Sequence, residues 1–288
     1  MKRTTRMQLA QETVEIVNRG NYKLPDGRKV SIQAMVEECL QDTHFHEPND
    51  YRRLREEALT RPAFPGPASV ELRNETTLEG IGRTLAEHPN VPLATLNFAS
   101  AKNPGGGFLG GSQAQEESLA RSSALYASLL TVPEYYARHR AMSSCLYTDA
   151  MIVSPGCPVF RTDEGDLLEA PRRATFITCA APNAGAVAKN TPKEMRLLPD
   201  VLRQRAENVL CVAAHGGYRH LLLGAWGCGV FQNDPELVAG IFADLLAGGG
   251  LWADRFEKVV FSVLDHSADQ AIFSAFKAKF ARRSRPVP

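Results

Sequence analysis

Two short apolar runs of this chain lead directly into glycine-rich loops, and each loop delivers the chain to the start of a helix. The run 91–98 precedes Asn103–Glu117, a glycine-dense loop that ends in two adjacent glutamates, and the run 220–225 precedes Trp226–Asn233. Asp234-Pro235 then has the residue types of a helix N-cap and first turn. Runs so short and apolar predict buried strands. Strands that alternate with helices predict an α/β fold with a mixed, mostly parallel sheet flanked by helices.

The remaining apolar segments extend the same alternation. Strands are predicted at residues 70–73, 174–180 and 258–264, and helices at 78–85, about 194–214 and beyond 267. Ser267 and Gln270 have capping-box spacing for this last helix, and residues 282–288 are expected to fray. Residues 149–161 are expected to turn back at Pro155-Gly156, and the chain after the first loop keeps helical spacing as far as Leu130.

The N-terminal residues form a pattern of their own. The predicted elements are a helix at 6–19 ended by Gly20, a hairpin around Pro25–Gly27, and helices at about 33–41 and 51–59. We therefore expect residues 1–60 to form an N-terminal helical and hairpin extension packed on the core. His44 and His46 are interpreted as surface or capping residues, because no third metal ligand lies near them in the sequence.

Composition excludes several classes of function. The 288 residues carry 33 basic and 32 acidic side chains, so the overall charge of +1 favours neither nucleic acid nor a membrane surface. The six cysteines are scattered without metal-ligand spacing, which is typical of reduced thiols in a cytoplasmic protein. No run has the pattern of a signal peptide or the length of a membrane span.

The first loop has the properties of an anion site. Its five glycines between Gly105 and Gly111 permit positive φ and let the backbone approach a ligand with no Cβ in the way. The helix start that follows offers free N–H groups and the positive end of the helix dipole. Because ligands of open α/β sheets bind at the carboxyl ends of the strands, the two glycine loops together suggest a cradle for a diphosphate.

A dinucleotide-binding fingerprint is an alternative interpretation of the same glycines. Gly105, Gly107 and Gly110 match its spacing, which leaves a nicotinamide-dependent oxidoreductase open. However, the acidic ribose ligand expected at the end of the next strand is missing. Glu116 and Glu117 lie within about two turns of the loop, where each carboxylate near a phosphate costs on the order of 1–4 kcal/mol. A P-loop is excluded because no Gly-Lys-Ser/Thr follows the glycines.

The two glutamates fit chemistry on a sugar that lies next to the diphosphate. A carboxylic acid beside a ribose can protonate a departing glycosidic oxygen and then, as a carboxylate, activate water. The alternative is that Glu116 and Glu117 are acids favoured by the dipole in the first turns of a helix. Ser112 and Gln115 have capping-box spacing and would satisfy the helix start without either glutamate, which counts against that alternative.

The order of these motifs resembles that of the poly(ADP-ribose) glycohydrolases, most closely the bacterial-type branch. Gly105–Gly107, followed after seven residues by Gln115–Glu117, resembles the family signature, and Gly227–Phe231 resembles its second ligand loop. The resemblance implies a macrodomain fold over roughly residues 60–282, within a macrodomain-like catalytic domain at 61–288. The N-terminal helix and hairpin resemble the amino-terminal extension of that branch.

The resemblance also implies roles for individual residues. Glu117 would be the catalytic acid/base, and Glu116 would hold the ribose hydroxyls. The backbone of both loops would bind the diphosphate, and Phe231 would pack against the distal ribose, unless it is an ordinary core aromatic. Cys228 is interpreted as a small packing residue rather than a nucleophile. The substrate-binding residues implied are Asn103, Gly105, Gly106, Gly107, Gln115, Gly227, Cys228, Gly229, Val230 and Phe231.

The implied activity is hydrolysis of the ribose–ribose O-glycosidic bonds of poly(ADP-ribose), which releases ADP-ribose. The implied partners are ADP-ribose and poly(ADP-ribose), including the polymer on ADP-ribosylated proteins, as in reversal of ADP-ribosylation during a DNA damage response. No cofactor and no metal are implied. A macrodomain that binds ADP-ribose without hydrolysis, with its glutamates serving only as ribose ligands, stays open as the alternative.

Overall fold

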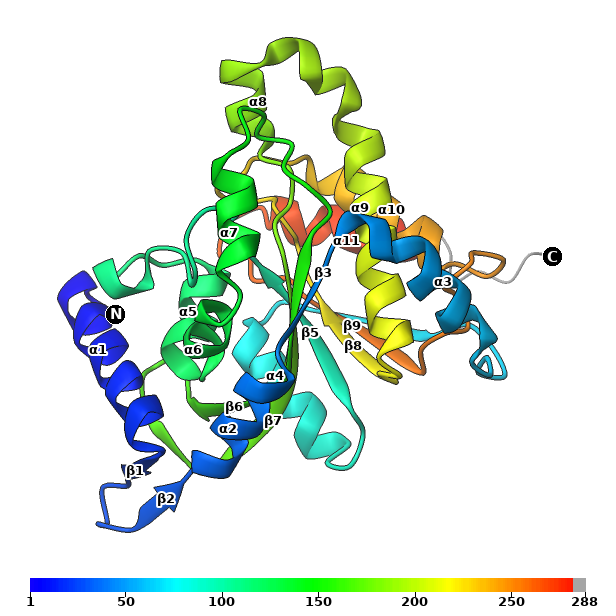
Figure 1. Ribbon diagram of the computed structural model, residues 1–288. Helices are drawn as coiled ribbons and strands as arrows, with labels where there is room; N and C mark the ends of the chain where they lie inside the picture. The colour runs from blue at the N-terminus through cyan, green and yellow to red at the C-terminus, as the bar shows by residue number, and fades with distance from the viewer. Residues whose placement is uncertain (282–288) are drawn as a thin grey trace.

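A seven-stranded mixed sheet with helices on both faces forms the centre of the computed structural model, which describes residues 1–281 (Figure 1). The strand order is β3-β6-β7-β5-β8-β9-β4. The pairings from β7 through β5, β8 and β9 to β4 are parallel, whereas β3, β6 and β7 pair antiparallel. These strands are β3 (His44–His46), β4 (Ser69–Arg73), β5 (Leu93–Phe98), β6 (Met151–Arg161), β7 (Leu167–Cys179), β8 (His220–Leu223) and β9 (Lys258–Ser262). The predicted mixed, mostly parallel sheet is confirmed.

Alternation along the strands divides the core between the two faces of the sheet. On β9, Val259 and Phe261 belong to one hydrophobic cluster, whereas Val260 belongs to the other. The first cluster is completed by α3 (Tyr51–Thr60), α8 (Ala184–Asn190), α9 (Leu198–His215), α10 (Pro235–Leu246) and α11 (Ala271–Ala281). The second is completed by α1 (Arg3–Arg19), α2 (Gln33–Asp42), α4 (Thr77–Glu87), α5 (Gln115–Ser122), α6 (Leu125–Leu130) and α7 (Pro133–Arg140). Two 3-10 turns, η1 (Pro48–Asp50) and η3 (Pro192–Leu197), precede α3 and α9.

The N-terminal elements follow the sequence pattern closely. Gly20 ends α1 in the left-handed region with φ of 67° and donates its N–H to the carbonyl of Val17, as a glycine C-cap does. The strands β1 (Asn21–Lys23) and β2 (Lys29–Ser31) form the predicted hairpin. β3 then pairs antiparallel with β6, so residues 44–46 form an edge strand of the main sheet. The division of the chain at residue 60 stays a prediction.

The middle of the chain corrects one expectation. Residues 151–161 do not turn back at Pro155-Gly156 but continue as the single strand β6, and its partner β7 begins at Leu167 rather than 174. A shift of register between Ser154 and Cys157 accommodates the proline, which has no N–H for the ladder. Gly156 takes φ of 55° there and donates its N–H to Oγ1 of Thr175.

Helix ends supply further corrections. The helix after the first loop stops at Ser122, because Ser123 is extended and bridges to Val159 of β6 before α6 begins. The predicted capping box at Ser267 is wrong: Oδ2 of Asp265 accepts the N–H groups of Ile272 and Phe273 instead, and its Oδ1 holds the Ser267 hydroxyl. Residues 282–288, expected to fray, lie outside the described residues.

No helix within residues 1–281 combines the length and apolar character that crossing a membrane requires.

Candidate active site

A cavity of about 500 Å³ opens at the carboxyl ends of the parallel strands β4, β5, β8 and β9. Its walls are the segments that follow these strands, together with the start of α5 and the tip of the β6–β7 hairpin. Both glycine-rich loops therefore reach the same cavity, as expected for ligand binding in an open α/β sheet. The size suits a nucleotide-sized ligand.

The first glycine loop folds against the helix that carries the two glutamates. Gly105 and Gly106 have φ of 65° and 59°, values that favour glycine. A Cβ at Gly106 would lie 2.4 Å from Oε1 of Glu117 and 3.3 Å from Oε2 of Glu116. The missing Cβ was expected to let the backbone approach a ligand. In the structure it lets the backbone at Gly106 approach the carboxylates of Glu116 and Glu117. A short 3-10 turn, η2 (Phe108–Gly110), follows, and α5 begins only at Gln115.

Glu116 is buried beneath this loop, with 2% of its surface exposed. Its Oε2 accepts the N–H of Ser100 at 2.7 Å, and its Oε1 accepts the side-chain amide of Asn97 at 3.2 Å. Burial and, to a smaller extent, the charge of Glu117 raise the pKa of Glu116 to about 8, against hydrogen bonds from Ser100, Asn97 and Gly105 that favour the ionised form. Glu116 therefore holds a proton at neutral pH that an exposed glutamate would have released.

Glu117 points into the cavity and is half-buried. Its Oε1 accepts the backbone N–H of Gly107 at 3.0 Å. Within residues 1–281, no protein donor is recorded for its Oε2, so this atom is available to a ligand. The two neighbouring glutamates thus differ in environment: both oxygens of Glu116 accept hydrogen bonds from protein donors, whereas within residues 1–281 only one oxygen of Glu117 does.

Gln115 corrects the predicted capping box. The N-cap position of α5 is Ala114, and no side chain caps this helix. Gln115 instead accepts the N–H of Phe98 at 2.9 Å and donates to the carbonyl of Leu96 at 2.8 Å. Its amide therefore satisfies the end of β5 and fixes α5, with both glutamates, to the sheet.

The second loop is shaped by buried polar contacts. Gly227 has φ of 74°, and a Cβ there would lie 2.3 Å from the amide nitrogen of Asn233 and 2.6 Å from the Cβ of Ala181. The indole N–H of Trp226 donates to the carbonyl of Cys179 at 3.0 Å and ties the loop to β7. Burial raises the pKa of Cys228 to about 12, which agrees with its interpretation as a packing residue.

The predicted site residues divide into two groups. Those that line the cavity are Gln115, Glu116, Glu117, Gly227, Gly229, Val230 and Phe231. Those that lie behind or beside it are Asn103, Gly105, Gly106, Gly107 and Cys228. Asn103 is exposed, and its carbonyl accepts the N–H of Gly106 at 3.0 Å. Phe231 is half-buried, with its ring 6.2 Å from that of Tyr147, and Val230 is 78% exposed at the rim.

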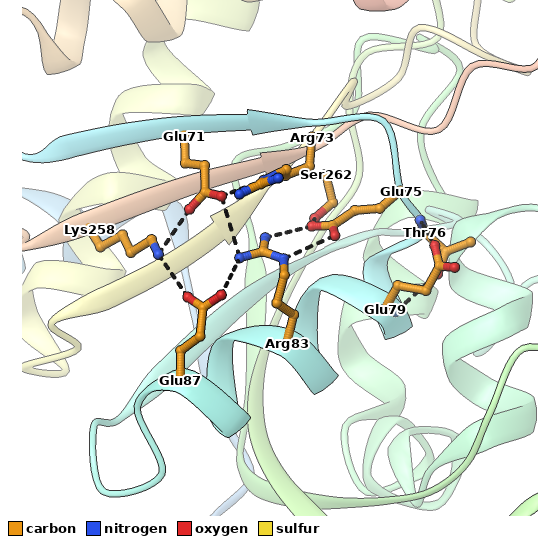
Figure 2. A network of polar contacts seen from close by, with 9 residues as sticks. All are labelled: Glu71, Arg73, Glu75, Thr76, Glu79, Arg83, Glu87, Lys258 and Ser262. Atoms are coloured by element: carbon orange, nitrogen blue, oxygen red, sulfur yellow. Dashed lines mark hydrogen bonds and ion pairs between the residues drawn. The ribbon is translucent and has the colours of Figure 1, made fainter.

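Sequence reasoning missed the residues at the other end of the cavity, where Glu75 and Ser262 meet (Figure 2). Oε1 of Glu75 accepts the Ser262 hydroxyl at 2.9 Å and Nη2 of Arg83 at 2.8 Å, and its Oε2 accepts Nε of Arg83. Asp163, at the tip of the β6–β7 hairpin, lies 2.5 Å from the hydroxyl of Thr76. The sequence offered one signal that Glu75 and Ser262 belong to the site, which is their position. Ser262 ends β9 and Glu75 follows β4, so both lie at the carboxyl edge of the sheet.

Ion pairs behind this end of the cavity hold Arg83 in place (Figure 2). Arg83 contacts Glu71 and Glu87 at 3.5 and 3.4 Å, and Lys258 bridges the same two carboxylates at 2.9 and 3.1 Å. Partial burial opposes ionisation of Glu71, but hydrogen bonds from Lys258 and Arg73 and the charge of Arg83 lower its pKa to about 2. The network therefore fixes the guanidinium that orients Glu75.

The charges of the side chains that line the cavity determine which groups can bind an anion there. Four carboxylates line the cavity, those of Glu75, Glu116, Glu117 and Asp163, and no lysine, arginine or histidine is among the described lining residues. A phosphate in this cavity must therefore rely on backbone N–H groups, such as those of the second glycine loop, whose Gly227 and Gly229 line the cavity. Within residues 1–281, no group of three or more His, Cys, Asp or Glu side chains is arranged to hold a metal ion.

The sheet order, the cavity at its carboxyl edge and the glycine loops around an acidic pair define a macrodomain-like α/β domain with an acid-bearing ligand site. A family model described as "Microbial-type PARG, catalytic domain" matches residues 10–162. PARG stands for poly(ADP-ribose) glycohydrolase. The chain belongs to the microbial-type PARG family.

Solved structures agree with this assignment. The poly(ADP-ribose) glycohydrolase from Thermomonospora curvata, bound to the inhibitor ADP-HPD, is 45% identical, with 96% of this chain and 100% of that chain covered and a TM-score of 0.89. The enzyme from Deinococcus radiodurans, in complex with ADP-ribose, is 44% identical, with 88% and 99% covered and a TM-score of 0.80. No curated protein matches significantly.

Proposed function

We propose that Glu117 carries out the proton transfers by which this chain, a glycosidase, hydrolyses the ribose–ribose O-glycosidic bonds of poly(ADP-ribose) and releases ADP-ribose. The observation that carries the proposal is that Glu117 lines the cavity with Oε1 held by Gly107, while within residues 1–281 no protein group donates a hydrogen bond to its Oε2. A carboxyl group fixed at one oxygen and open at the other is oriented for proton transfer to a bound ligand.

The reaction follows from this geometry. The Glu117 carboxylic acid gives its proton to the 2′-oxygen of the departing ribose as the bond from that oxygen to the anomeric carbon breaks. An oxocarbenium-like ion forms at the anomeric carbon. The Glu117 carboxylate then takes a proton from water, whose oxygen bonds to the anomeric carbon. The carboxyl group is regenerated, and ADP-ribose and the shortened polymer are the products.

The other predicted residues would hold the substrate for this step. Glu116, enclosed by the Ser100 N–H and the Asn97 amide, is rigid enough to fix the ribose hydroxyls beside Glu117. Backbone N–H groups of the second loop would bind the diphosphate, which is supported by the lack of any basic side chain among the described lining residues. The Gly105–Gly107 backbone would lie beside the diphosphate without supplying the N–H groups of Gly106 and Gly107, which are donated to the Asn103 carbonyl and to Glu117. Asn103 would help Glu116 to fix the same sugar, and Phe231 would pack against the distal ribose.

The decisive variant is Glu117→Gln, which keeps the size and the hydrogen bond to Gly107 but removes the proton. We expect release of ADP-ribose from poly(ADP-ribose) to fall by at least about a hundredfold, while ADP-ribose binding measured by calorimetry stays near that of the wild type. Glu134→Gln is the matched control, because Glu134 is also in the first turn of a helix, α7, and is exposed. Unchanged release by Glu117→Gln refutes the proposed role.

The cellular setting is a second part of the proposal. We infer that the polymer it cleaves is attached to ADP-ribosylated proteins and that the enzyme reverses this modification in the cytoplasm, for example after DNA damage. Support comes from its family membership and from six free cysteines, which suit a reducing compartment. In cells that lack the protein, ADP-ribosylated proteins should persist after DNA damage, and complementation with the wild type but not with Glu117→Gln should remove them.

A further inference from the structure

The helix α1 contacts the catalytic loop through two arginines. Nε of Arg3 donates to the carbonyl of Gly110 at 2.9 Å, and Nε of Arg6 donates to the carbonyl of Gly111 at 2.7 Å. Gly111 has φ of 73°, and a Cβ there would lie 2.6 Å from the carbonyl oxygen of Arg3. The helix and the loop therefore approach each other as closely as their backbones allow.

The segment held by these arginines leads directly to Glu117. The N–H groups of Gly110 and Ser112 both donate to the carbonyl of Gly107, at 3.0 and 3.1 Å. The N–H of the same Gly107 holds Oε1 of Glu117. A continuous set of hydrogen bonds therefore runs from Arg3 and Arg6 through a tight turn to the proposed catalytic carboxylate.

The same helix also contacts α5, which carries both glutamates (Figure 1). The hydroxyl of Thr13 donates to the carbonyl of Arg121 at 2.5 Å, and Arg121 donates in turn to the carbonyl of Ser112 at 2.7 Å. Ala10 is completely buried in a small cluster with Phe108 of the loop and Ala120 of α5. The loop and the catalytic helix are therefore joined by a third element from outside the sheet.

A third contact of α1 involves the β6–β7 hairpin, whose tip also lines the cavity. Glu12 of α1 pairs at 3.1 Å with Arg161, which is buried near the end of β6. Arg161 donates to the carbonyl of Gly165 at 2.7 Å and so holds the hairpin tip that places Asp163 in the cavity. The helix α1 thus contacts both the glycine loop and the residue that holds the hairpin tip.

We propose that α1 is a positioning element of the active site and that Arg3 and Arg6 are positioning residues for Glu117. Neither arginine lines the cavity, so the two side chains act through the carbonyls of Gly110 and Gly111. Without them, the turn at Gly107–Ser112 keeps its internal hydrogen bonds and the one from Arg121 to Ser112 but loses both hydrogen bonds from α1, and Glu117 samples orientations that miss the glycosidic oxygen. The inference rests on the proposed role of Glu117.

The test is the double variant Arg3→Ala/Arg6→Ala, assayed as ADP-ribose release from poly(ADP-ribose). We expect kcat to fall roughly tenfold, because small displacements of a catalytic group are costly, while KM and the Kd for ADP-ribose stay within about twofold. Arg6→Lys, which keeps a cationic N–H donor, should recover part of the rate. Arg19→Ala is the matched control, because Arg19 is an exposed arginine in the last turn of the same helix.

Each other outcome counts against the inference. A double variant with the kcat of the wild type and of Arg19→Ala overturns it. So does a variant in which kcat, ADP-ribose affinity and thermal stability fall together, since that is general loss of structure rather than misplacement of one carboxylate. The same assay on Glu117→Gln separates the two proposals: an active Glu117→Gln overturns both, whereas an inactive one beside a fully active double variant overturns the role of α1 alone.

Discussion

The backbone N–H of Gly107 donates a hydrogen bond to Oε1 of Glu117 over 3.0 Å, so the glycine loop and the proposed catalytic carboxylate form one unit. Gly106 lies against the same oxygen, with no space for a side chain. The glycines therefore do more than admit a ligand. They let the backbone reach the carboxylate of Glu117, a residue that lines the cavity, and fix one of its two oxygens.

This contact predicts the effect of a single methyl group. In Gly106→Ala the new Cβ would lie 2.4 Å from Oε1 of Glu117, and φ of 59° is strained for alanine. We expect the side chain of Glu117 to be displaced and kcat to fall by at least about tenfold. The measurement is the rate of ADP-ribose release at saturating polymer.

Gly110→Ala is the control within the same loop. A Cβ at Gly110 meets no atom within 4 Å, and its φ lies outside the left-handed region. Its activity should stay within about twofold of the wild type. Equal losses in the two variants would mean that the loop tolerates no side chain anywhere, and that the contact with Glu117 is not the reason.

The buried carboxyl of Glu116 predicts a dependence of stability on pH. Its pKa is about 8 in the folded protein and near the ordinary 4.5 in the unfolded chain. Between these values the folded state binds a proton that the unfolded state has released. The free energy of unfolding therefore falls as pH rises from about 4.5 to 8, by a few kcal/mol in all, and this loss is constant above pH 8.

Denaturant unfolding of Glu116→Gln across pH 4 to 9 tests this effect. The amide cannot ionise, so the difference in unfolding free energy between variant and wild type should shift in favour of the variant as pH rises through this window. Glu134→Gln should show no such trend, because Glu134 is exposed. Parallel pH profiles for Glu116→Gln and wild type would show that Glu116 is ionised in the folded protein.

Local patterns predicted the parts of the site that lie next to one another in the chain. The sequence predicted the strands before both loops and the two glutamates at a helix start. It also predicted that α10 begins with a proline after Asp234. Gln115 shows the limit of this reasoning. Its spacing from Ser112 matched a capping box, but the end of β5 offered unpaired backbone groups that the amide satisfies instead.

Contacts between distant segments could not be predicted. Glu75 and Ser262 meet because β4 and β9 are neighbours in the sheet, a pairing between residues almost two hundred positions apart. The dinucleotide spacing was misleading for a related reason. Gly110 ends a 3-10 turn, and α5 begins five residues later, so the fingerprint glycines do not open a helix. The continuous strand β6 was not predicted, because its proline and glycine are typical of a turn but lie in a bulge of the strand.

The network behind Glu75 predicts a change in binding rather than in chemistry. In Arg83→Met, Glu75 keeps the Ser262 hydroxyl but loses the bidentate partner of a mostly buried carboxylate, and stability should fall by about 1–3 kcal/mol. Because Glu75 lines the cavity but has no hydrogen bond to Glu117, we expect KM for the polymer and Kd for ADP-ribose to rise several-fold with little change in kcat. Steady-state kinetics and calorimetry measure these separately.

A surface arginine supplies the control for this variant. Arg53→Met removes an exposed i,i+4 pair with Glu57 on α3, which is worth only a few tenths of a kcal/mol and is far from the lining residues. It should leave KM, Kd and stability unchanged. A fall in kcat for Arg83→Met with constant Kd would contradict the assignment of Glu75 to substrate binding.

Cys228, although it is part of the second ligand loop, is expected to be dispensable for the reaction. The residue is 9% exposed, and its thiol lies 3.8 Å from the carbonyl oxygen of Trp226 and has a pKa that burial raises to about 12, so thiolate is scarce at neutral pH. Cys228→Ala should keep kcat within about twofold of the wild type, with a small loss of stability from the vacated volume. Iodoacetamide should leave wild-type activity intact under native conditions. Loss of activity in Cys228→Ala at unchanged thermal stability and ADP-ribose affinity would assign the thiol a chemical role that Glu117 does not explain.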